Sequence, residues 1–243
     1  MRGVLVTGAS GGIGSAISAA FQRSGWRVVA TDRDSATAGD AFIPADLERI
    51  ATDDEYARDF HHKVMDALDG APLAALVNNA ALQILASASK LSAEDWQKTL
   101  AVNLIAPFRL SQAFLRELKA AKGTIVNIGS VHAQATKKGF AAYATSKAAL
   151  HGLTRALAVD LGPDVRVVCI APAAVATDML YAGFTNNPEG LSELAASHPL
   201  NRIGMPPEIA AATVAITEEP FLFLTGSVVW LDGGVLSRLH DPA

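Results

Sequence analysis

The chain of 243 residues lacks several features, and each missing feature removes a class of protein from consideration. Cys169 is the only cysteine, so no disulfide can form within the chain, and its place in the apolar run VRVVCIA predicts a buried core residue. No basic run occurs and the formal net charge is −4, which argues against nucleic acid as a partner. No apolar stretch of about 18 residues predicts a membrane span, and no signal-peptide pattern is present, so we expect a cytoplasmic protein.

Short apolar runs recur along the chain, at 3–7, 26–31, 41–45, 73–78, 123–129, 165–171 and 227–231. Their valines and isoleucines form nearly continuous stretches, which is typical of a parallel sheet covered on both faces. Helix-like segments lie between most of these runs, at 12–24, 53–68, 94–120, 141–161 and 206–217. The alternation predicts an α/β fold of the Rossmann type, a doubly wound seven-stranded parallel sheet with helices on both faces, in a single domain over 1–243.

The stretch 178–205 departs from this alternation, because it holds Pro, Gly, Asn and scattered aromatics and shows no strand pattern. A loop of that length inside a compact domain is often a functional lid, so we expect it to cover a substrate site. Two helix boundaries are also predicted. Ser92 should cap the helix that follows it, and Gly162 with Pro163 should end the helix over 141–161.

A glycine-rich turn separates the first apolar run from the first helix in GVLVTGASGGIGSAI. The turn comprises Gly8, Ser10, Gly11, Gly12, Ile13 and Gly14. Glycines there allow a tight turn and the close approach of a ligand, and the helix N-terminus beyond them suits a pyrophosphate. The spacing matches neither G-x-G-x-x-G nor a Walker loop, and a plain glycine-rich turn is the alternative.

Asp32 ends the second apolar run at a position where a carboxylate can accept hydrogen bonds from the ribose diol of a dinucleotide. It would repel a 2′-phosphate, which favours NAD over NADP. Arg33 next to it weakens that preference, since an arginine can hold a 2′-phosphate. The alternative interpretation of Asp32 is a solvated turn residue.

Tyr143 and Lys147 lie on one face of the predicted helix AAYATSKAAL, about one turn apart. An unperturbed tyrosine has a pKa of about 10, whereas a general base works best with a pKa near the operating pH. A nearby ammonium and an oxidised nicotinamide both favour the phenolate, so we expect the pKa of Tyr143 to fall. The alternative is that Tyr143 and Lys147 lie on the helix surface and do not act together.

Together these motifs resemble the classical short-chain dehydrogenases/reductases over essentially the whole chain. TGASGGIG is similar to the cofactor turn of that family, NNAA at 78–81 to its N-N-A-G with Ala81 in place of glycine, and YATSK to its Y-x-x-x-K. Ser130 precedes Tyr143 by the family's usual thirteen residues. The resemblance implies that Tyr143 is the catalytic acid/base, that Ser130 positions the substrate oxygen and that Lys147 binds the nicotinamide ribose. It also implies that Asn103 holds a water in a proton relay.

The resemblance also implies a cofactor site. That site comprises Gly8, Ser10, Gly11, Gly12, Ile13, Gly14, Asp32, Arg33, Asp46, Leu47, Asn79, Ala80, Ala81, Tyr143, Lys147, Pro172, Val175 and Thr177. Asp46 and Leu47 should flank the adenine, Asn78 and Ala80 should lie along the adenosine ribose, and Val175 and Thr177 should contact the carboxamide. Ala173 stands where the family usually has glycine. Only thirteen residues separate Asp32 from Asp46, so we expect the helix usual there to be missing or one turn long.

The substrate pocket should be lined by Gln83, His132, the 134–140 segment and the 178–200 lid. Gln83 and His132 resemble the carboxylate-binding residues of 3-hydroxybutyrate dehydrogenases, which makes a small hydroxy acid one candidate substrate. Phe140 stands where that subgroup has a lysine. Ordinary loop polarity is the alternative for Gln83 and His132, and sugars, polyols, cyclic alcohols and 3-oxoacyl thioesters stay open.

The implied activity is hydride transfer between NAD and a secondary alcohol or ketone, with NADP less favoured as the cofactor. The alternatives are an NADPH-dependent carbonyl or 3-oxoacyl reductase and a cofactor-binding regulator without turnover. His61 and His62 point about 100° apart on a helix and have no third ligand at suitable spacing, so no metal is expected. His151 is expected at a packing face or subunit contact. We expect a small-molecule substrate, no membrane partner, and a homo-oligomer, a dimer or tetramer, formed through 94–120 and 141–161.

Overall fold

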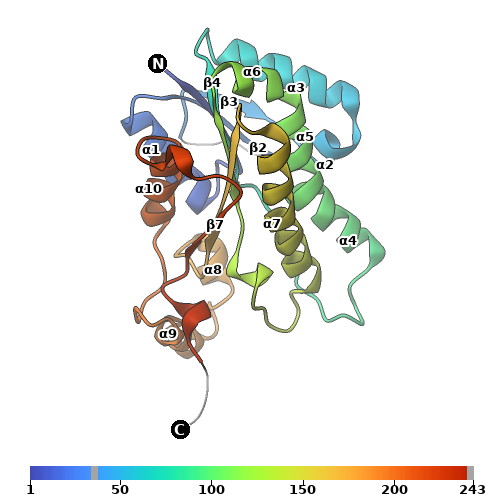
Figure 1. Ribbon diagram of the computed structural model, residues 1–243. Coiled ribbons are helices and arrows are strands. Elements are labelled where there is room, and N and C mark those ends of the chain that lie inside the picture. Colours follow the sequence, from blue (N-terminus) through green and yellow to red (C-terminus); the bar gives the residue numbers. More distant parts are fainter. Residues whose placement is uncertain (34–37, 240–243) are drawn as a thin grey trace.

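The computed structural model describes residues 1–33 and 38–239, and a seven-stranded parallel sheet runs through its centre (Figure 1). The strands are β1 (Gly3–Thr7), β2 (Arg27–Asp32), β3 (Ala41–Pro44), β4 (Leu73–Asn78), β5 (Thr124–Ile128), β6 (Arg166–Pro172) and β7 (Val228–Leu231). They lie in the order β3-β2-β1-β4-β5-β6-β7, and every neighbouring pair is parallel. The order reverses after β1, which confirms the doubly wound α/β prediction and its seven strands.

Helices cover both faces of the sheet (Figure 1). One face is covered by α1 (Gly12–Arg23) and α10 (Pro206–Ile216). The other carries α2 (Leu47–Thr52), α3 (Asp54–Ala67), α4 (Ala93–Leu100), α5 (Ala106–Ala113), α6 (Leu115–Ala120) and α7 (Ala141–Leu161). Two further helices, α8 (Asp178–Ala182) and α9 (Pro188–Ser197), lie beyond the carboxyl ends of the strands.

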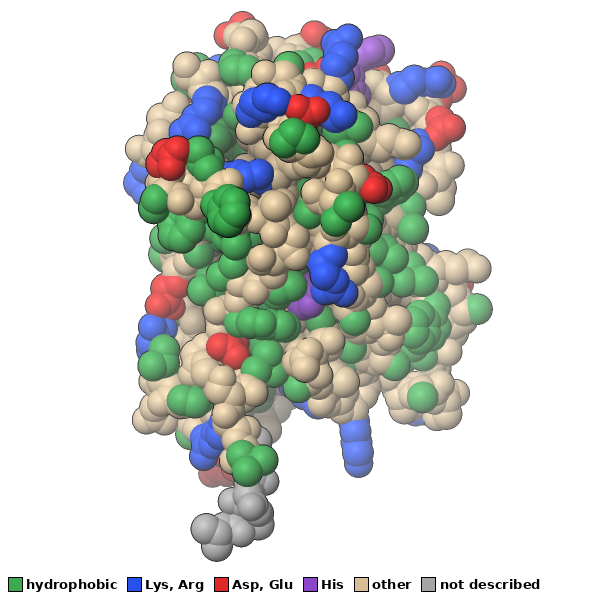
Figure 2. All heavy atoms as spheres, in the orientation of Figure 1, with side chains coloured by type: hydrophobic (Ala, Val, Ile, Leu, Met, Phe, Trp, Pro, Cys, Tyr) green, Lys and Arg blue, Asp and Glu red, His purple; other side chains and the backbone are tan. Residues whose placement is uncertain are grey.

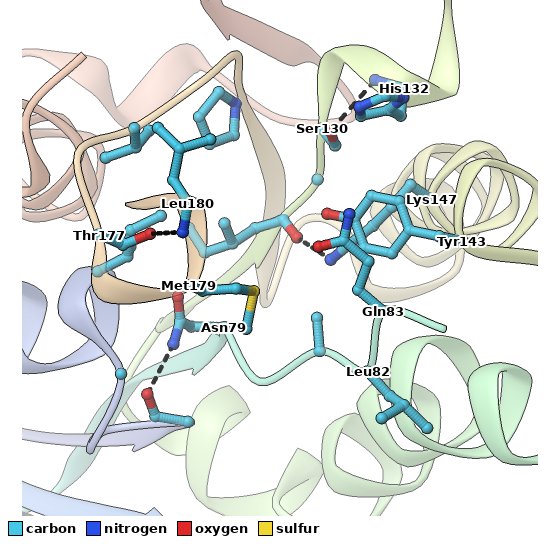
Figure 3. A pocket seen from close by; sticks show the side chains of 18 of the residues that line it. Asn79, Leu82, Gln83, Ser130, His132, Tyr143, Lys147, Thr177, Met179 and Leu180 are labelled. Atoms are coloured by element: carbon cyan, nitrogen blue, oxygen red, sulfur yellow. Dashed lines mark hydrogen bonds between the residues drawn. The ribbon is translucent and has the colours of Figure 1, made fainter. Parts of the chain in front are cut away.

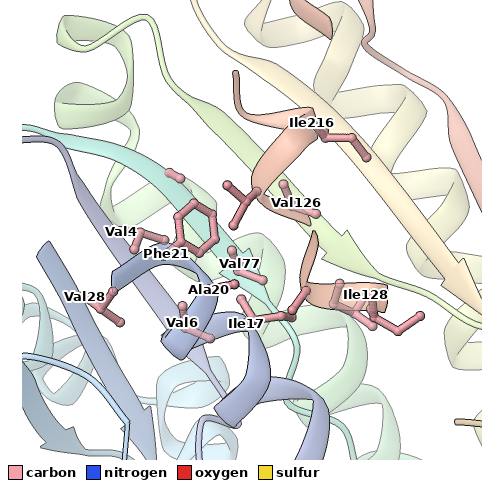
Figure 4. Packing of buried hydrophobic residues seen from close by; sticks show 14 of the residues in the cluster. Val4, Val6, Ile17, Ala20, Phe21, Val28, Val77, Val126, Ile128 and Ile216 are labelled. Carbon is pink, nitrogen blue, oxygen red and sulfur yellow. The ribbon is translucent and has the colours of Figure 1, made fainter. Parts of the chain in front are cut away.

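Each central strand contributes side chains to two separate cores. Val4 and Val6 of β1 pack with Phe21 of α1 on one face, as Figure 4 shows. Leu5, between them in sequence, points to the other face and packs with the cluster that holds Phe114. Because both faces are buried, the strands have no polar alternation, which explains the continuous apolar runs. Cys169 in β6 is fully buried, as expected.

Two segments differ from their predicted form. The segment 94–120 is not one helix, because a π-helical turn at Ala101–Ile105 separates α4 from α5 and a further break separates α5 from α6. The segment 178–205 is not a long loop, because it forms α8 and α9. Their N-termini are capped by Thr177 and Asn187, whose side chains accept hydrogen bonds from backbone N–H groups. Such caps replace the missing intrahelical partners of a helix end.

The two predicted helix boundaries occur where the sequence placed them. Ser92 caps α4 in a capping box with Asp95, and α7 ends at Leu161 before Gly162, as expected. Residue 33 and residues 38–40 are not helical, while 34–37, where part of the expected short helix would fall, lie outside the described residues. On the face shown in Figure 2, acidic and basic side chains are intermingled, in keeping with the net charge of −4.

Candidate functional site

A cavity of about 1120 Å³ opens at the carboxyl ends of the strands, the place where doubly wound sheets bind their ligands. Segments that follow β1, β2, β4, β5 and β6 line it, together with α8, α9 and the chain end after β7. All predicted cofactor residues line this cavity except Asn78, and so do Ser130, Gln83, His132 and Phe140. The predicted 134–140 segment and 178–200 lid each line it in part. Asn78 is instead buried and donates to Asn127 Oδ1 at 2.8 Å, so its expected place along a ribose is wrong.

The glycine turn is built so that no side chain fits at its centre. Gly8 has φ +65°, and a Cβ there would lie 2.7 Å from Ala80 Cα. A Cβ on Gly14 would lie 2.0 Å from the carbonyl oxygen of Gly8. Asn79 fixes the turn by donating through Nδ2 to the carbonyl oxygens of Thr7 and Gly8, at 2.9 and 3.0 Å. The first turn of α1 has no side-chain cap, and its residues Gly12, Ile13 and Gly14 line the cavity, so an anion could be bound by its N–H groups.

Asp32 lies at the rim of this turn, and its carboxylate is held by three donors. Both the backbone N–H of Ser10, at 3.1 Å, and the Ser10 hydroxyl donate to Oδ2, and the backbone N–H of Arg33 donates to Oδ1 at 2.8 Å. A carboxylate has about four acceptor positions, so room for a further donor stays open. Asp46, farther along the cavity, caps α2 by accepting from Glu48 N at 2.8 Å.

The Tyr143–Lys147 pair lies one helical turn apart on α7, on the other side of the cavity (Figure 3). Lys147 is almost fully buried, and its Nζ donates to the carbonyl oxygen of Ile128 at 2.7 Å. Burial lowers the pKa of Lys147 to about 8. Burial also raises the pKa of Tyr143, and the interaction with Ser130 only partly offsets this. In the protein without a nicotinamide the pKa of Tyr143 is thus raised and not lowered as expected, because desolvation outweighs the hydrogen bond with Ser130.

Asn103 does not line the cavity but stands directly behind it, in the π-helical turn Ala101–Ile105. Its Nδ2 donates to Leu82 O at 2.9 Å and to Ser146 Oγ at 3.0 Å, and its Oδ1 accepts from Leu82 N at 2.7 Å. The side chain thus ties the segment after β4 to α7. Single π turns inside helices occur often at functional sites. The water relay predicted for Asn103 stays a prediction.

His132 lies against Tyr143. Its ring stacks on Phe140 at a centroid distance of 4.3 Å and meets Tyr143 edge to face at 5.8 Å. Its backbone N–H donates to Ser130 Oγ at 3.1 Å. Burial, and to a lesser extent the charge of Lys137, lower the pKa of His132 to about 4, so the ring is neutral at pH 7. In Figure 3 the Gln83 amide points toward Tyr143 from the opposite wall.

The end of α9 lines the cavity through Leu194, Ser197 and His198, which fall within the predicted 178–200 lid. Val235, Leu236 and Arg238 of the chain end also line it, and these were not predicted from the sequence. Arg238 donates through Nη1 to the carbonyl oxygens of Ala196 and Ser197, at 2.8 and 3.2 Å, and so holds the C-terminus of α9. A basic side chain there also complements the helix dipole. No local pattern marks these contacts, because they join segments about forty residues apart.

His61 and His151 lie outside the cavity and contact other side chains of the fold. His61 Nε2 lies 3.5 Å from Glu117 Oε1, and within residues 1–33 and 38–239 no group of three His, Cys, Asp or Glu could hold a metal ion. His151 packs inside the chain, edge to face against Trp230 at 5.4 Å, so the packing-face expectation holds. In the same described ranges, no helix combines the length and apolar character needed to cross a membrane.

Comparisons of the sequence with known proteins agree with this geometry. Residues 8–236 match the family model described as enoyl-(acyl carrier protein) reductase. Protein FixR of Bradyrhizobium diazoefficiens is 37% identical over 253 residues, which cover 95% of this chain and 85% of that protein. Galactitol 2-dehydrogenase (L-tagatose-forming) of Cereibacter sphaeroides is 36% identical over 236 residues, which cover 94% of this chain and 92% of that enzyme.

Solved structures share the fold along the whole chain. Ligand-free aldohexose dehydrogenase of Thermoplasma acidophilum superposes with a TM-score of 0.92 at 28% identity, covering 100% of this chain and 96% of the other. 4-Hydroxyisoleucine dehydrogenase complexed with NADH gives 0.87 at 27% identity, covering 98% and 100%. A 3-oxoacyl (acyl-carrier-protein) reductase of Agrobacterium tumefaciens with NADP bound gives 0.85 at 30%, covering 96% and 93%. Similar structures therefore hold either nicotinamide cofactor.

Proposed function

The chain belongs to the short-chain dehydrogenase/reductase family of oxidoreductases acting on CH–OH groups, and from this premise we propose that it uses NAD to interconvert a secondary alcohol and its ketone. The observation that supports the proposal is one cavity lined by the glycine turn, Asp32, Ser130, Tyr143 and Lys147. The turn fits a dinucleotide, because its backbone fills the space that side chains would need and its N–H groups face the cavity.

The catalytic steps follow from the side chains around Tyr143. A bound nicotinamide would supply or accept the hydride. In alcohol oxidation the Tyr143 phenolate takes the hydroxyl proton, and in ketone reduction the phenol returns it to the carbonyl oxygen. The Ser130 hydroxyl holds that oxygen beside the phenol. The Lys147 ammonium, anchored on Ile128 O one helical turn away, favours the phenolate by its positive charge.

The preference for NAD rests on the Asp32 carboxylate. Its orientation is set by Ser10 and by the backbone N–H of Arg33, so it presents a fixed negative charge to the cavity. That charge accepts a ribose hydroxyl and repels a 2′-phosphate. The runner-up, an NADPH-dependent carbonyl or 3-oxoacyl reductase, would need Arg33 to outweigh Asp32.

Fluorescence titration with NADH and NADPH tests the cofactor preference. We expect tighter binding of NADH by the wild type, and a shift of the ratio toward NADPH by about tenfold or more in Asp32→Ser. Asp66→Ser removes an equal charge from an exposed position on α3 outside the cavity and should leave the ratio unchanged. Tighter binding of NADPH by the wild type would overturn the NAD assignment and favour the reductase. Binding of neither nucleotide would favour a protein without turnover.

The substrate could be a small hydroxy acid or a polyol, and the cavity wall distinguishes the two. The neutral ring of His132 offers a carboxylate only a hydrogen bond and no charge, which weakens the case for a small hydroxy acid. Similarity to a galactitol dehydrogenase supports a polyhydroxylated alcohol instead. We therefore propose a polyol-type secondary alcohol as the substrate class. Turnover of 3-hydroxybutyrate in an NAD-coupled screen, without turnover of polyols, would reverse this order.

We also propose self-association through α7 and the segment 94–120. Ile105 and Phe108 are each 39% exposed, and Val159 on α7 is 82% exposed. Exposed apolar side chains of this kind mark interaction surfaces when they gather on one face. Light scattering after size exclusion tests the proposal. A dimer or tetramer is expected, and a monomer at micromolar concentration would contradict it.

A further inference from the structure

The first turn of α7 carries Tyr143, yet no side chain caps it. The helix begins at Ala141, and the side chain of the preceding Phe140 makes no capping hydrogen bond. A helix end without such a partner opens more easily than the helix interior, because its first N–H groups have no intrahelical acceptor. Proton transfer needs the phenol fixed to within a fraction of an ångström, so a contact from outside the helix is needed to hold this turn.

The hydroxyl of Ser146 makes such a contact behind the cavity. Ser146 is fully buried, and its Oγ donates to the carbonyl oxygen of Tyr143 at 2.7 Å. The same Oγ accepts from Asn103 Nδ2 at 3.0 Å. A carbonyl oxygen has two lone pairs, so this bond can form beside an intrahelical one. The backbone of Tyr143 is thus joined through Ser146 to the π-helical turn that holds Asn103.

The direction of each hydrogen bond in this series is set by the backbone of Leu82. Its N–H group can only donate, so the Asn103 atom that it meets at 2.7 Å is Oδ1. Nδ2 then uses its two hydrogens on Leu82 O and Ser146 Oγ, which leaves the serine hydrogen for Tyr143 O. The amide has no hydrogen left for another partner, and the serine hydroxyl cannot rotate without breaking its bond to Tyr143.

A second hydroxyl on α7 has the same kind of bonding but lies away from the cavity. Thr154 Oγ1 donates to Leu150 O and accepts from Asn127 Nδ2, both at 2.9 Å. Thr154 is fully buried like Ser146, and neither Thr154 nor its two partners line the cavity. Removal of either hydroxyl leaves a buried amide hydrogen without its acceptor, which costs stability. Thr154 therefore provides a control for effects on stability alone.

We propose that Ser146 is a positioning residue for the proposed reaction, because it holds the backbone of Tyr143 and so keeps the phenol aligned with the reacting oxygen. Lys147, the other member of the pair, is held separately by Ile128 O. Loss of the Ser146 hydroxyl lets Tyr143 move relative to Lys147 and Ser130, so proton transfer slows while the alcohol still binds. The inference rests on the proposed function, since it assumes that Tyr143 transfers the proton.

A matched pair of variants tests the proposal. Ser146→Ala and Thr154→Val each delete one of the two hydroxyls, and Ser146→Cys keeps a weak donor at the first position. Steady-state kinetics are measured with NAD and xylitol, or with the best polyol of the screen. Urea unfolding measures the stability of each variant.

We expect Ser146→Ala to lower kcat by about tenfold with KM within about twofold, and to raise the solvent isotope effect on kcat because proton transfer becomes slower. Ser146→Cys should give an intermediate kcat. Thr154→Val should lose similar stability but keep the kcat and isotope effect of the wild type. Equal losses of kcat in Ser146→Ala and Thr154→Val, or wild-type kcat in Ser146→Ala, would overturn the positioning role.

A spectroscopic readout separates this inference from the proposed activity. In protein with ¹³C-labelled tyrosine, the ring resonances of Tyr143 are identified by their absence in Tyr143→Phe. Ser146→Ala should shift them, and Thr154→Val should not. If no alcohol is oxidised with either nucleotide but the shift occurs, the proposed activity fails and the hold of Ser146 on Tyr143 stands. If turnover occurs and Ser146→Ala leaves the resonances in place, the positioning role is overturned.

Discussion

Two helices border the same cavity, α7 and α9, and they are held in different ways. Along its 21 residues α7 buries side chains against the sheet, among them Lys147 and Leu150. The 10 residues of α9 include none that is buried. Polar contacts hold it instead, namely the Asn187 cap at its start and Arg238 at its end. Figure 1 shows α7 beside the strands and α9 below their ends.

The contrast between the buried contacts of α7 and the polar contacts of α9 suits the two helices to different tasks. Proton transfer requires groups fixed to within a fraction of an ångström, and a helix anchored in a close-packed core provides that. A lid has to admit and release substrate, which requires a segment whose local opening costs little free energy. We therefore expect changes on α7 to alter the chemical step and global stability, and changes around α9 to alter substrate affinity.

The largest effect is expected from Tyr143→Phe, which removes the phenolic oxygen and leaves the buried ring. The kcat for alcohol oxidation and for ketone reduction should fall by about 10³-fold or more, because general acid–base catalysis is lost. Nucleotide affinity and the unfolding midpoint should change little. Tyr181→Phe, on α8 and outside the cavity lining, is the matched control and should keep kcat within about twofold. An active Tyr143→Phe enzyme would remove Tyr143 from the chemistry.

The next effect concerns pH and the buried lysine. The pKa of Lys147 is about 8 when folded and 10.5 as its ordinary value, so the unfolded chain holds the proton more tightly. Below pH 8 the burial cost of the ammonium is fully present. Between pH 8 and 10.5 the folded state releases its proton first, so the free energy of unfolding rises with pH, by about 3 kcal/mol at most.

Urea unfolding between pH 7 and 10 measures this rise. Lys147→Met should abolish it and should also lower kcat by about 100-fold, because the phenolate loses its ammonium. Lys138→Met, at an exposed position, removes the same charge and should keep the rise. Equal pH profiles for the wild type and Lys147→Met would show that Lys147 does not titrate in this window.

The two regions also differ in how far the sequence predicts them. Strands and α7 follow from continuous apolar runs and from helical spacing, because both patterns record burial in the core. The π turn at Ala101–Ile105 leaves no such mark, since the apolar pattern continues through it. For α9 a signal existed, because Asn187 precedes Pro188, an N-cap followed by proline at the first helical position.

Some features depend on tertiary structure and have no local signal. The raised pKa of Tyr143 comes from burial, whereas its spacing from Lys147 alone predicts the opposite direction. The place of Arg238 on the cavity wall requires the chain end to meet α9. The residues proposed for proton transfer were therefore predicted from the sequence, and the structure adds the contacts that join α9 to the chain end.

A moderate effect is expected from Arg238→Ala, which releases the carbonyl oxygens of Ala196 and Ser197. We expect KM for the alcohol to rise by about threefold to tenfold, with kcat and the unfolding midpoint nearly unchanged, because only the lid loosens. Steady-state kinetics with a substrate from the screen measures this. Arg116→Ala, an exposed arginine on α6, is the control. A loss of kcat equal to that of KM would show that α9 also positions the reacting groups.

The smallest effects come from two helix caps, and as a pair they test the comparison directly. Ser92→Ala removes the cap of α4, and Asn187→Ala removes the cap of α9, where Asn187 Oδ1 accepts from Gly190 N at 2.9 Å. Each loss should cost about 1 kcal/mol in the helix concerned.

For Ser92→Ala the loss should appear in the free energy of global unfolding, because α4 unfolds with the core, and KM should stay the same. For Asn187→Ala it should appear as faster amide exchange in α9 and a KM raised by up to about fivefold, with global stability nearly unchanged. If Asn187→Ala destabilises the whole protein as much as Ser92→Ala does, then α9 unfolds with the core and cannot act as a separate lid.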